Sequence, residues 1–342
     1  MRINWRRRAV VLPALGIILL AAVVLATAIG SVALPLGEVL RALASRLTGG
    51  ASGGSTDTII WQIRIPRVLT AVIVGGALGT AGAVFQGLLR NPMADPYIIG
   101  TSGGAALGAT VALMVPIQVS LFGFTFVSVA AFVGALGAVL LVYNIARVGP
   151  RTPVTTLLLT GFALSSILAA IMSFLMFISN NALRRIILWT MGGLSGAGWV
   201  QLGVVIPAIV IALAAVYALA PDLNAFLLGD EQAASLGVNV ERRKLLLLAL
   251  GSWMTAAAVS VSGLVGFVGL VVPHVVRLIL GPDHRLLLPA STLVGGVFLV
   301  IADLAARSLM PPAELPVGII TALVGGPFFI YLLRKSRREY SF

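Results

Sequence analysis

Residues 61–105 read WQIRIPRVLTAVIVGGALGTAGAVFQGLLRNPMADPYIIGTSGGA. Two arginines, Arg64 and Arg67, precede a mostly apolar run that breaks at Asn91 and Pro92. At about 1.5 Å per residue, this run is long enough to cross the hydrocarbon core of a bilayer as a helix. Small residues recur at every fourth position along it, namely Gly75, Gly79, Ala83 and Gly87. Because such a face lets another helix approach closely in lipid, we predict a tightly packed transmembrane helix followed by non-helical backbone that protein shields.

One amide, Gln86, lies near the end of this predicted helix. An amide in hydrocarbon is costly unless another helix or water satisfies it, so Gln86 needs a partner. The stretch alone leaves a simpler interpretation open, in which it is an ordinary packed transmembrane helix.

The composition of the whole chain indicates a polytopic membrane protein. Of its 342 residues, 59% are hydrophobic and only 10% are charged, and the mean hydropathy is +1.08. No soluble fold could bury that much apolar surface. The chain has no cysteines, which excludes thiolate metal sites, disulfides and thiol catalysis. A net charge of +12 would suggest nucleic acid in a soluble protein, but here it indicates topology, and no nucleic-acid partner is expected.

Apolar runs separated by charges or by Gly and Pro predict an all-α fold of ten transmembrane helices in a single domain, 1–342. The spans are predicted near 9–33, 66–89, 97–116, 121–146, 154–179, 199–220, 243–263, 267–281, 286–306 and 315–334. The eighth is too short to cross as a helix alone, and glycines before it suggest an extended approach. The first follows a basic N-terminus but is too long for a signal peptide, so it is expected to be uncleaved.

The Lys and Arg residues predict the orientation. With the N-terminus inside, sixteen of the 23 basic residues fall in cytoplasmic segments and seven fall outside. Because basic residues favour cytoplasmic loops, we predict a protein of the cell membrane with both termini cytoplasmic. Ten spans divide into five plus five, and an odd-numbered half forces any internal repeat to be inverted. Two breaks rich in Gly and Pro, at 91–104 and 263–273, fall at matching places in the halves.

Few acids accompany the arginines that are predicted on the outer side. Arg64 and Arg67 lie three apart, so one helical turn would place them on one face. Asp303 and Arg307, at i and i+4, can pair with each other. Long basic side chains often extend to the membrane surface without a specific partner. The alternative is that these arginines form a docking surface for an acidic partner protein.

The longest predicted cytoplasmic loop, 221–244, reads PDLNAFLLGDEQAASLGVNVERRK. Residues 224–236 could form a short amphipathic helix that ends at Gly237, since glycine is a common signal for a helix C-terminus. Asp230 and Glu231 lie there in an otherwise basic face. The helix could rest on the lipid headgroups or form a socket for a cytoplasmic partner, and the loop alone leaves both open.

Several chemical activities are excluded. Residues 193–196 match the GxSG motif of intramembrane serine proteases. Ser195 falls near the predicted outer face, whereas His274 and His284 fall towards the inner face, so no serine–histidine hydrogen bond is possible. No HExxH motif and no cluster of acids within the spans supports a metal site.

The sequence also bears on two possible energy sources for transport, an ion gradient and ATP. A secondary transporter would need ionisable groups or ion sites inside the spans. Asp303 is the only carboxylate predicted near a span interior, so the chain lacks the ionisable groups that this class of transporter needs. The chain has no GxxxxGK[ST] motif either, so any ATP must be hydrolysed by another polypeptide.

At least five sequence blocks, in order, resemble the permease subunits of type II ABC importers, which take up ferric siderophores, haem and cobalamin. The blocks are RIPR (64–67), GAVFQGLLRNPMADPYIIGTSGGA (82–105), LLLTGFALSS (157–166), LLGDEQAASLGV (227–238), SGLVGFVGLVVPHVVRLILGPDHRLLLP (262–289), ADLAAR (302–307) and ELPVGIITALVGGPFFIYLL (314–333). The resemblance covers nearly the whole chain.

The resemblance implies a homodimer of ten-helix subunits in the bilayer, with the translocation path at the dimer axis. Two cytoplasmic ATPase subunits would lie below it and one extracytoplasmic substrate-binding protein above. No cofactor is expected on this chain, because ATP and Mg would bind to the ATPases. A ferric siderophore is the first substrate expected, on family abundance, with haem and cobalamin as alternatives. An ion-coupled secondary transporter is the alternative of another class.

By position, the resemblance also implies three groups of functional residues. The residues that would meet acids on the binding protein are Arg64, Arg67 and Arg307. Those that would couple to the ATPases are Asn224, Leu228, Gly229, Asp230, Glu231, Ala234, Leu236 and Gly237. The path and its cytoplasmic gate would include Pro153, Val154, Thr155, Thr156, Gln86, Asn91 and Pro92, with a lining from the fifth and tenth spans and 182–196. Val154 stands where some members have a small hydroxyl residue.

Overall fold

The computed structural model of the chain is a helical bundle, described for residues 5–30, 34–47, 54–115, 117, 119–121, 123–149, 152–179 and 182–337. The helices are α1 Trp5–Ala28, α2 Leu36–Leu47, α3 Ser55–Thr58, α4 Ile65–Leu88, α5 Thr101–Met114, α6 Phe126–Ala146, α7 Val154–Ile178, α8 Leu183–Thr190, α9 Trp199–Ala218, α10 Ala220–Phe226, α11 Asp230–Ser235, α12 Val240–Ser262, α13 Val268–Leu280, α14 His284–Ser308 and α15 Val317–Arg337. A π-helical segment, Ile59–Arg64, joins α3 to α4, and two short strands, β1 Ser120–Leu121 and β2 Phe124–Thr125, pair antiparallel.

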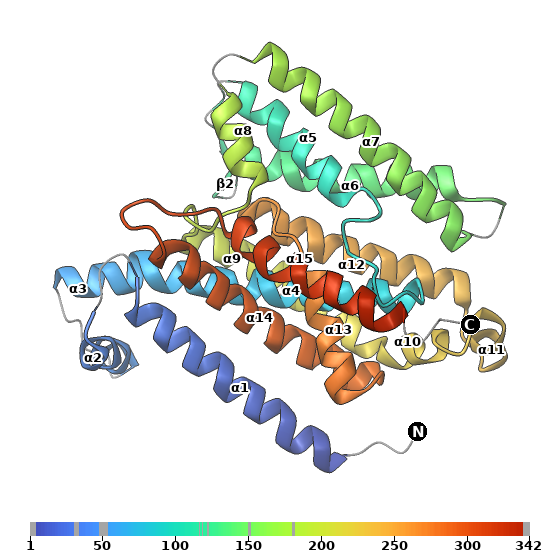
Figure 1. Cartoon of the computed structure of the whole chain (residues 1–342), viewed down its shortest axis with the longest axis horizontal. Coiled ribbons are helices and arrows are strands. Elements are labelled where there is room, and N and C mark those ends of the chain that lie inside the picture. The colour runs from blue at the N-terminus through green and yellow to red at the C-terminus, as the bar shows by residue number, and fades with distance from the viewer. Residues whose placement is uncertain are drawn as a thin grey trace.

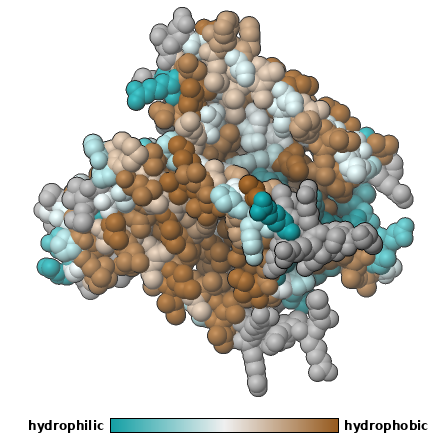
Figure 2. Space-filling view, in the orientation of Figure 1, coloured by the Kyte–Doolittle hydropathy of each residue, from teal (hydrophilic) through white to brown (hydrophobic). Residues whose placement is uncertain are grey.

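Seven helices are long and apolar enough to cross a membrane. Three shorter apolar helices accompany them: Thr101–Met114, Val268–Leu280 and Val317–Leu332. Each predicted span contains one of these helices, and the eighth is as short as expected. The count of ten complete crossings stays a prediction, because the short helices lack the length of a full crossing. Apolar residues cover much of the face in Figure 2, as contact with lipid requires.

The helix of the second span begins earlier than predicted. It runs continuously over Thr56–Leu88, whereas the sequence predicted a start at residue 66. Pro66 has no backbone N–H, so it cannot complete a regular helical hydrogen bond. The N–H of Ile65 instead donates to the carbonyl of Ile60, five residues back, which widens the helix just before the proline. This wider turn lets the helix continue into Pro66 rather than begin there.

Helix α4 lies at the centre of the bundle. It packs against α14 on one side and α12 on the other, with α13 beside them. Helix α1 covers α14 at the lower edge of Figure 1, and α5, α6 and α7 form a group at the upper edge. Every residue of 74–89 is buried. The prediction of a tightly packed helix is therefore confirmed.

Glycines bring the backbone of α4 into direct contact with its neighbours. A Cβ atom on Gly75 would collide with the carbonyl oxygen of Gly295 in α14, and a Cβ on Gly295 would collide with that of Gly75. A Cβ on Gly82 would likewise collide with the backbone of Gly269 in α13. The predicted small-residue face thus serves packing within this chain.

Replacing Gly75 with alanine is expected to destabilise the protein by about 1–3 kcal/mol, because no rotamer change can relieve a collision between a Cβ and a backbone carbonyl. Gly137→Ala is the matched control, since a Cβ at Gly137 of α6 meets open space. Alanine there should leave stability unchanged or raise it by up to about 1 kcal/mol. Unfolding of both variants in one detergent measures the difference, and equal stability would contradict the close contact.

Candidate functional site

A buried ionic cluster joins α4, α14 and the segment before α15. Arg67 Nε and Nη2 donate to Asp303 Oδ1 at 3.0 and 2.9 Å, and Arg67 Nη1 donates to the two oxygens of Glu314 at 3.0 and 2.9 Å. Arg307 Nε lies 3.4 Å from Asp303 Oδ2, which confirms the predicted i and i+4 pair. Asp303 therefore balances two guanidinium groups at once.

Two arginines of this cluster hold the end of α1. Arg64 Nη1 donates to the carbonyls of Thr27 and Ala28 at 2.7 and 2.8 Å, and Arg307 Nη2 donates to the carbonyl of Ala26. The last carbonyls of a helix have no partner within the helix and carry its partial negative charge. Two guanidinium groups at this position therefore complete the C-terminus of α1.

These contacts bear on the two alternatives for these arginines. Asp303, which the sequence had already paired with Arg307, and Glu314 both contact Arg67. The simpler alternative, that the side chains extend to the membrane surface without a specific partner, is wrong. Instead, Arg64, Arg67 and Arg307 are only 5%, 9% and 5% exposed, since they are drawn into the chain by carboxylates and carbonyls. Their role in docking stays a prediction. A docking partner would meet guanidinium groups that are already buried and paired within the chain.

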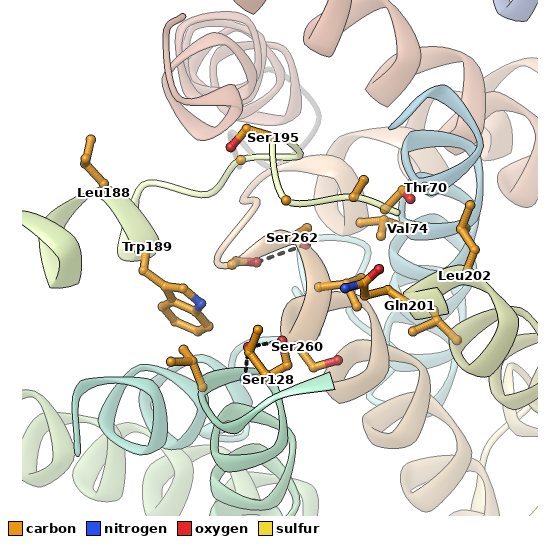
Figure 3. Close-up of a pocket in the computed structure, with 18 of the residues that line it drawn as sticks. Thr70, Val74, Ser128, Leu188, Trp189, Ser195, Gln201, Leu202, Ser260 and Ser262 are labelled. Atoms are coloured by element: carbon orange, nitrogen blue, oxygen red, sulfur yellow. Dashed lines mark hydrogen bonds between the residues drawn. The ribbon is translucent and has the colours of Figure 1, made fainter. Parts of the chain in front are cut away.

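A cavity of about 420 Å³ lies near the end of α4 that carries Arg67 (Figure 3). Trp189 of α8 borders it on one side, and Gln201 and Leu202 of α9 border it on the other. Residues of the predicted lining segment 182–196 take part in its wall, whereas none of the described residues of α7 or α15 does.

The polar groups of this cavity are mostly engaged by backbone. Gln201 Nε2 donates to the carbonyl of Gly123 at 3.3 Å, and Ser260 and Ser262 donate to carbonyls one helical turn away in α12, at 2.8 and 2.9 Å. Arg185 is the one charged side chain among the described lining residues. The cavity thus offers space and few directed donors. Its described lining includes Ser195 but no histidine.

The two predicted breaks in the helices meet through one tyrosine. Tyr97 Oη donates to the carbonyl of Val265 at 3.0 Å and lies 3.2 Å from the N–H of the same residue. Asp95 Oδ1 accepts the N–H of Tyr97 at 2.8 Å, which holds the turn before α5. Residues 94–100 of this non-helical backbone are buried or half-buried, as expected, whereas its first residues are exposed. Sequence reasoning missed both Asp95 and Tyr97, although an Asp followed two residues later by a backbone donor is a common turn signal.

The amide of Gln86 has the partners that the sequence required. Its Oε1 accepts from Arg277 Nη1 at 2.8 Å, and its Nε2 donates to the carbonyl of Leu270 at 3.1 Å. The side chain is buried between α4 and α13, so it does not line an open path within the subunit. Asn91 and Pro92, in contrast, are exposed at the end of α4, where Asn91 Oδ1 accepts the N–H of Met93.

The predicted helix over 224–236 is two helices, α10 and α11, which corrects the single-helix expectation. Gly229 between them has a φ of +112°, a conformation that interrupts a helix and that glycine adopts without strain. The predicted end at Gly237 is confirmed by a φ of +84°. Of the predicted coupling residues, Gly229 is buried, and the exposed ones are Leu228, Glu231, Ala234, Leu236 and Gly237.

Two coupling candidates are instead engaged within the chain. Asn224 Nδ2 donates to Asp283 at 2.8 Å and its Oδ1 accepts the N–H of His284 at 2.8 Å, so α10 is tied to the start of α14. Asp230 pairs with Arg90 at 3.1 Å and with Lys244, which tie α11 to the end of α4 and to α12. Both residues therefore position the segment.

The predicted gate turn lies beside this coupling segment. Pro153, Val154, Thr155 and Thr156 begin α7, and Pro153 and Thr155 are exposed. The N–H of Thr152 donates to Glu241 Oε2 in the first turn of α12 at 3.2 Å. Movement of the start of α12 therefore reaches the start of α7 through one hydrogen bond.

Comparisons with known proteins agree with this architecture. The sequence pattern of the FecCD transport family matches residues 18–335 of this chain. The chain is 50% identical over 280 residues to the "Cobalamin import system permease protein BtuC" of Halobacterium salinarum, which covers 82% of this chain and 74% of that protein. It is 42% identical over 297 residues to the "Hemin transport system permease protein HmuU" of Yersinia pestis, covering 84% and 87% of the two chains.

A solved structure gives the same result for the fold. It is described as an inward-facing conformation of a metal-chelate type ABC transporter, and it matches with a TM-score of 0.81 at 31% identity. The match covers 95% of this chain and 99% of the other. The chain therefore belongs to the FecCD transport family.

Proposed function

We propose that this chain is the membrane permease of an ATP-driven importer that moves a large metal chelate into the cytoplasm. Family membership supports the transporter class, and relatives at 50% and 42% identity are named as permeases for cobalamin and hemin. The cavity beside α8 supports the proposal further, because it provides room with few directed contacts. Such a permease leaves recognition of the substrate to a separate binding protein.

The exposed face of α7 supports a homodimer. Small and hydroxyl residues recur on it at helical spacing: Ala163, Ser166, Ala170 and Ser173, all exposed. A face that only contacted lipid would need no such residues, whereas small residues suit close approach of a second helix or the wall of a polar path. A second copy of the chain packed near α7 would therefore place the path between the two subunits.

We also propose the inverted five-plus-five repeat and ten spans for this chain. An inverted repeat that relates the second span to the seventh and the fourth to the ninth predicts matching helix pairs. Helix α4 packs on α14, and α12 correspondingly packs on α6. The two irregular breaks joined by Tyr97 and Val265 fall at equivalent points of the two halves.

The partners would lie at opposite ends of this dimer. Two ATPase subunits would contact the exposed residues of α10 and α11 on the cytoplasmic side, and a binding protein would dock at the end that carries the ionic cluster. ATP binding would draw the ATPases together, move the coupling segments, and open the path to one side and then the other. The orientation with both termini cytoplasmic belongs to this proposal.

Cobalamin is the first substrate to test, because the relative named for it is 50% identical to this chain. Hemin is the second, through the relative at 42% identity. A ferric siderophore, which the sequence analysis placed first, remains a candidate through the metal-chelate type of the solved neighbour.

The purified permease in liposomes, with its cognate ATPase and binding protein, is expected to take up one of these three chelates. Uptake should need ATP and both partners. Omitting each partner in turn provides the control. Uptake by the permease alone, driven by an ion gradient, would contradict the proposal and would support a secondary transporter.

A further inference from the structure

The two carboxylates that hold Arg67 differ in their exposure. Asp303 engages Nε and Nη2 of the guanidinium, and its side chain is only 1% exposed. Glu314 engages Nη1, the remaining edge, and its side chain is 40% exposed. The inner carboxylate is thus enclosed by protein, whereas the outer one can be reached from solution.

Glu314 also lies on a connection that can move. It belongs to the non-helical segment 309–316 between α14 and α15, in which residues 309–314 are exposed. One backbone hydrogen bond, from Leu315 N–H to the carbonyl of Ala306 at 3.0 Å, holds it to α14. Release of Glu314 would therefore remove one of the contacts that hold the segment before α15, without disturbing the buried pair.

Arg64 and Arg307 also hold the end of α1. Arg64 and Arg307 donate to carbonyls at the end of α1, and Arg307 also pairs with buried Asp303. A docking protein could take those donors only by leaving the carbonyls of α1 unsatisfied, which costs free energy. Arg67 can accept a new carboxylate on its Glu314 edge with no loss of paired charge.

Resting on the proposed function, we propose that Glu314 is an internal stand-in for a carboxylate of the extracytoplasmic binding protein. In the free permease Glu314 occupies the outward edge of Arg67, and on docking an acidic side chain of the partner displaces it. An exchange of one carboxylate for another keeps the guanidinium paired throughout. The Glu314 side of the pair is 40% exposed, and access to water weakens an ion pair and so favours such an exchange.

The displacement would carry a signal to the proposed path. Val317 N–H donates to the carbonyl of Gly192, and Gly318 N–H donates to that of Met191, both at 3.1 Å. The next residue along that turn, Gly193, lines the cavity beside α8. Freeing Glu314 would thus loosen the start of α15 and, through these two hydrogen bonds, the turn at 191–193 that borders the cavity.

The test measures the affinity of the purified binding protein for the permease–ATPase complex in lipid nanodiscs. Glu314→Gln removes the competing charge and should tighten binding about two- to fivefold, the range of one exposed ion pair. Glu38→Gln is the matched control, because Glu38 of α2 does not contact Arg67. It should change the affinity by less than Glu314→Gln does.

A second measurement separates the proposal from a merely structural role. In the wild type, docking should speed hydrogen exchange at 313–318, whereas in Glu314→Gln exchange there should already be fast and should not respond. Unchanged or weaker binding of Glu314→Gln, or slower exchange at 313–318 on docking, would overturn the stand-in role. If the wild type does not bind the binding protein at all, the proposed function fails. If the wild type binds but Glu314→Gln behaves as the wild type does, only the stand-in role fails.

Discussion

Replacing Asp303 with asparagine is expected to destabilise the protein by about 3–5 kcal/mol, the usual effect of removing one partner from a buried ion pair. Asp303 is the buried carboxylate between Arg67 and Arg307. Without it, two guanidinium groups with little access to water repel each other, and Glu314 is left to balance them. The end of α1 should loosen as well, since Arg307 also holds a carbonyl there.

Thermal or denaturant unfolding in detergent measures this effect, with Glu314→Gln as the matched control on the other side of Arg67. The control removes an exposed partner and should cost less than about 1 kcal/mol. Combining Asp303→Asn with Arg307→Met should recover part of the lost stability, because it removes one of the two unbalanced charges. If Asp303→Asn were no worse than the control, the buried cluster would not be a main support of this end of the bundle.

Replacing Leu228 with glutamate is expected to abolish ATP-driven uptake while the permease still folds. Leu228 is 62% exposed between α10 and α11, and Leu236 at the end of α11 is 65% exposed. Large apolar side chains held out on a rigid segment are typical anchors at a protein interface, where loss of one costs about 2 kcal/mol or more. That corresponds to roughly 30-fold weaker association with the ATPase.

Copurification with the ATPase and uptake in liposomes test this expectation together. Leu309→Glu provides the control, because Leu309 is similarly exposed, at 63%, but follows α14 at the opposite end of the bundle. It should keep association with the ATPase. Normal coupling in Leu228→Glu would show that the ATPase contacts another surface.

The fold was predictable where the membrane dictates the pattern. Each predicted span contains a helix because only long apolar runs can satisfy their backbone within lipid. The pair of Asp303 and Arg307 was predictable because i and i+4 residues of a helix are neighbours. The small residues of α4 predicted a close helix contact, although not that Gly295 would provide it.

The candidate sites were less predictable, because they depend on distant parts of the chain. The partners of Arg67 lie 236 and 247 positions further along, beyond the reach of any local spacing rule. The division of 224–236 into two helices depends on the backbone angle of Gly229, and glycine within a helical pattern permits a break without requiring one. The cavity is lined by at least five helices and strands, so no single sequence motif could predict it.

The backbone contact between Gly75 and Gly295 constrains how the subunit can change shape. Most helix interfaces can slip, because side chains at the boundary switch rotamers and repack. At Gly75 and Gly295 two main chains meet with no side chain between them, so this point of the α4–α14 interface cannot repack. These two helices form one rigid unit at this point, and the distance between Gly75 and Gly295 should stay constant through the transport cycle. Movement must then come from the surrounding helices, among them α15, which packs on α14, and α7, which packs on α5 and α6 rather than on this unit.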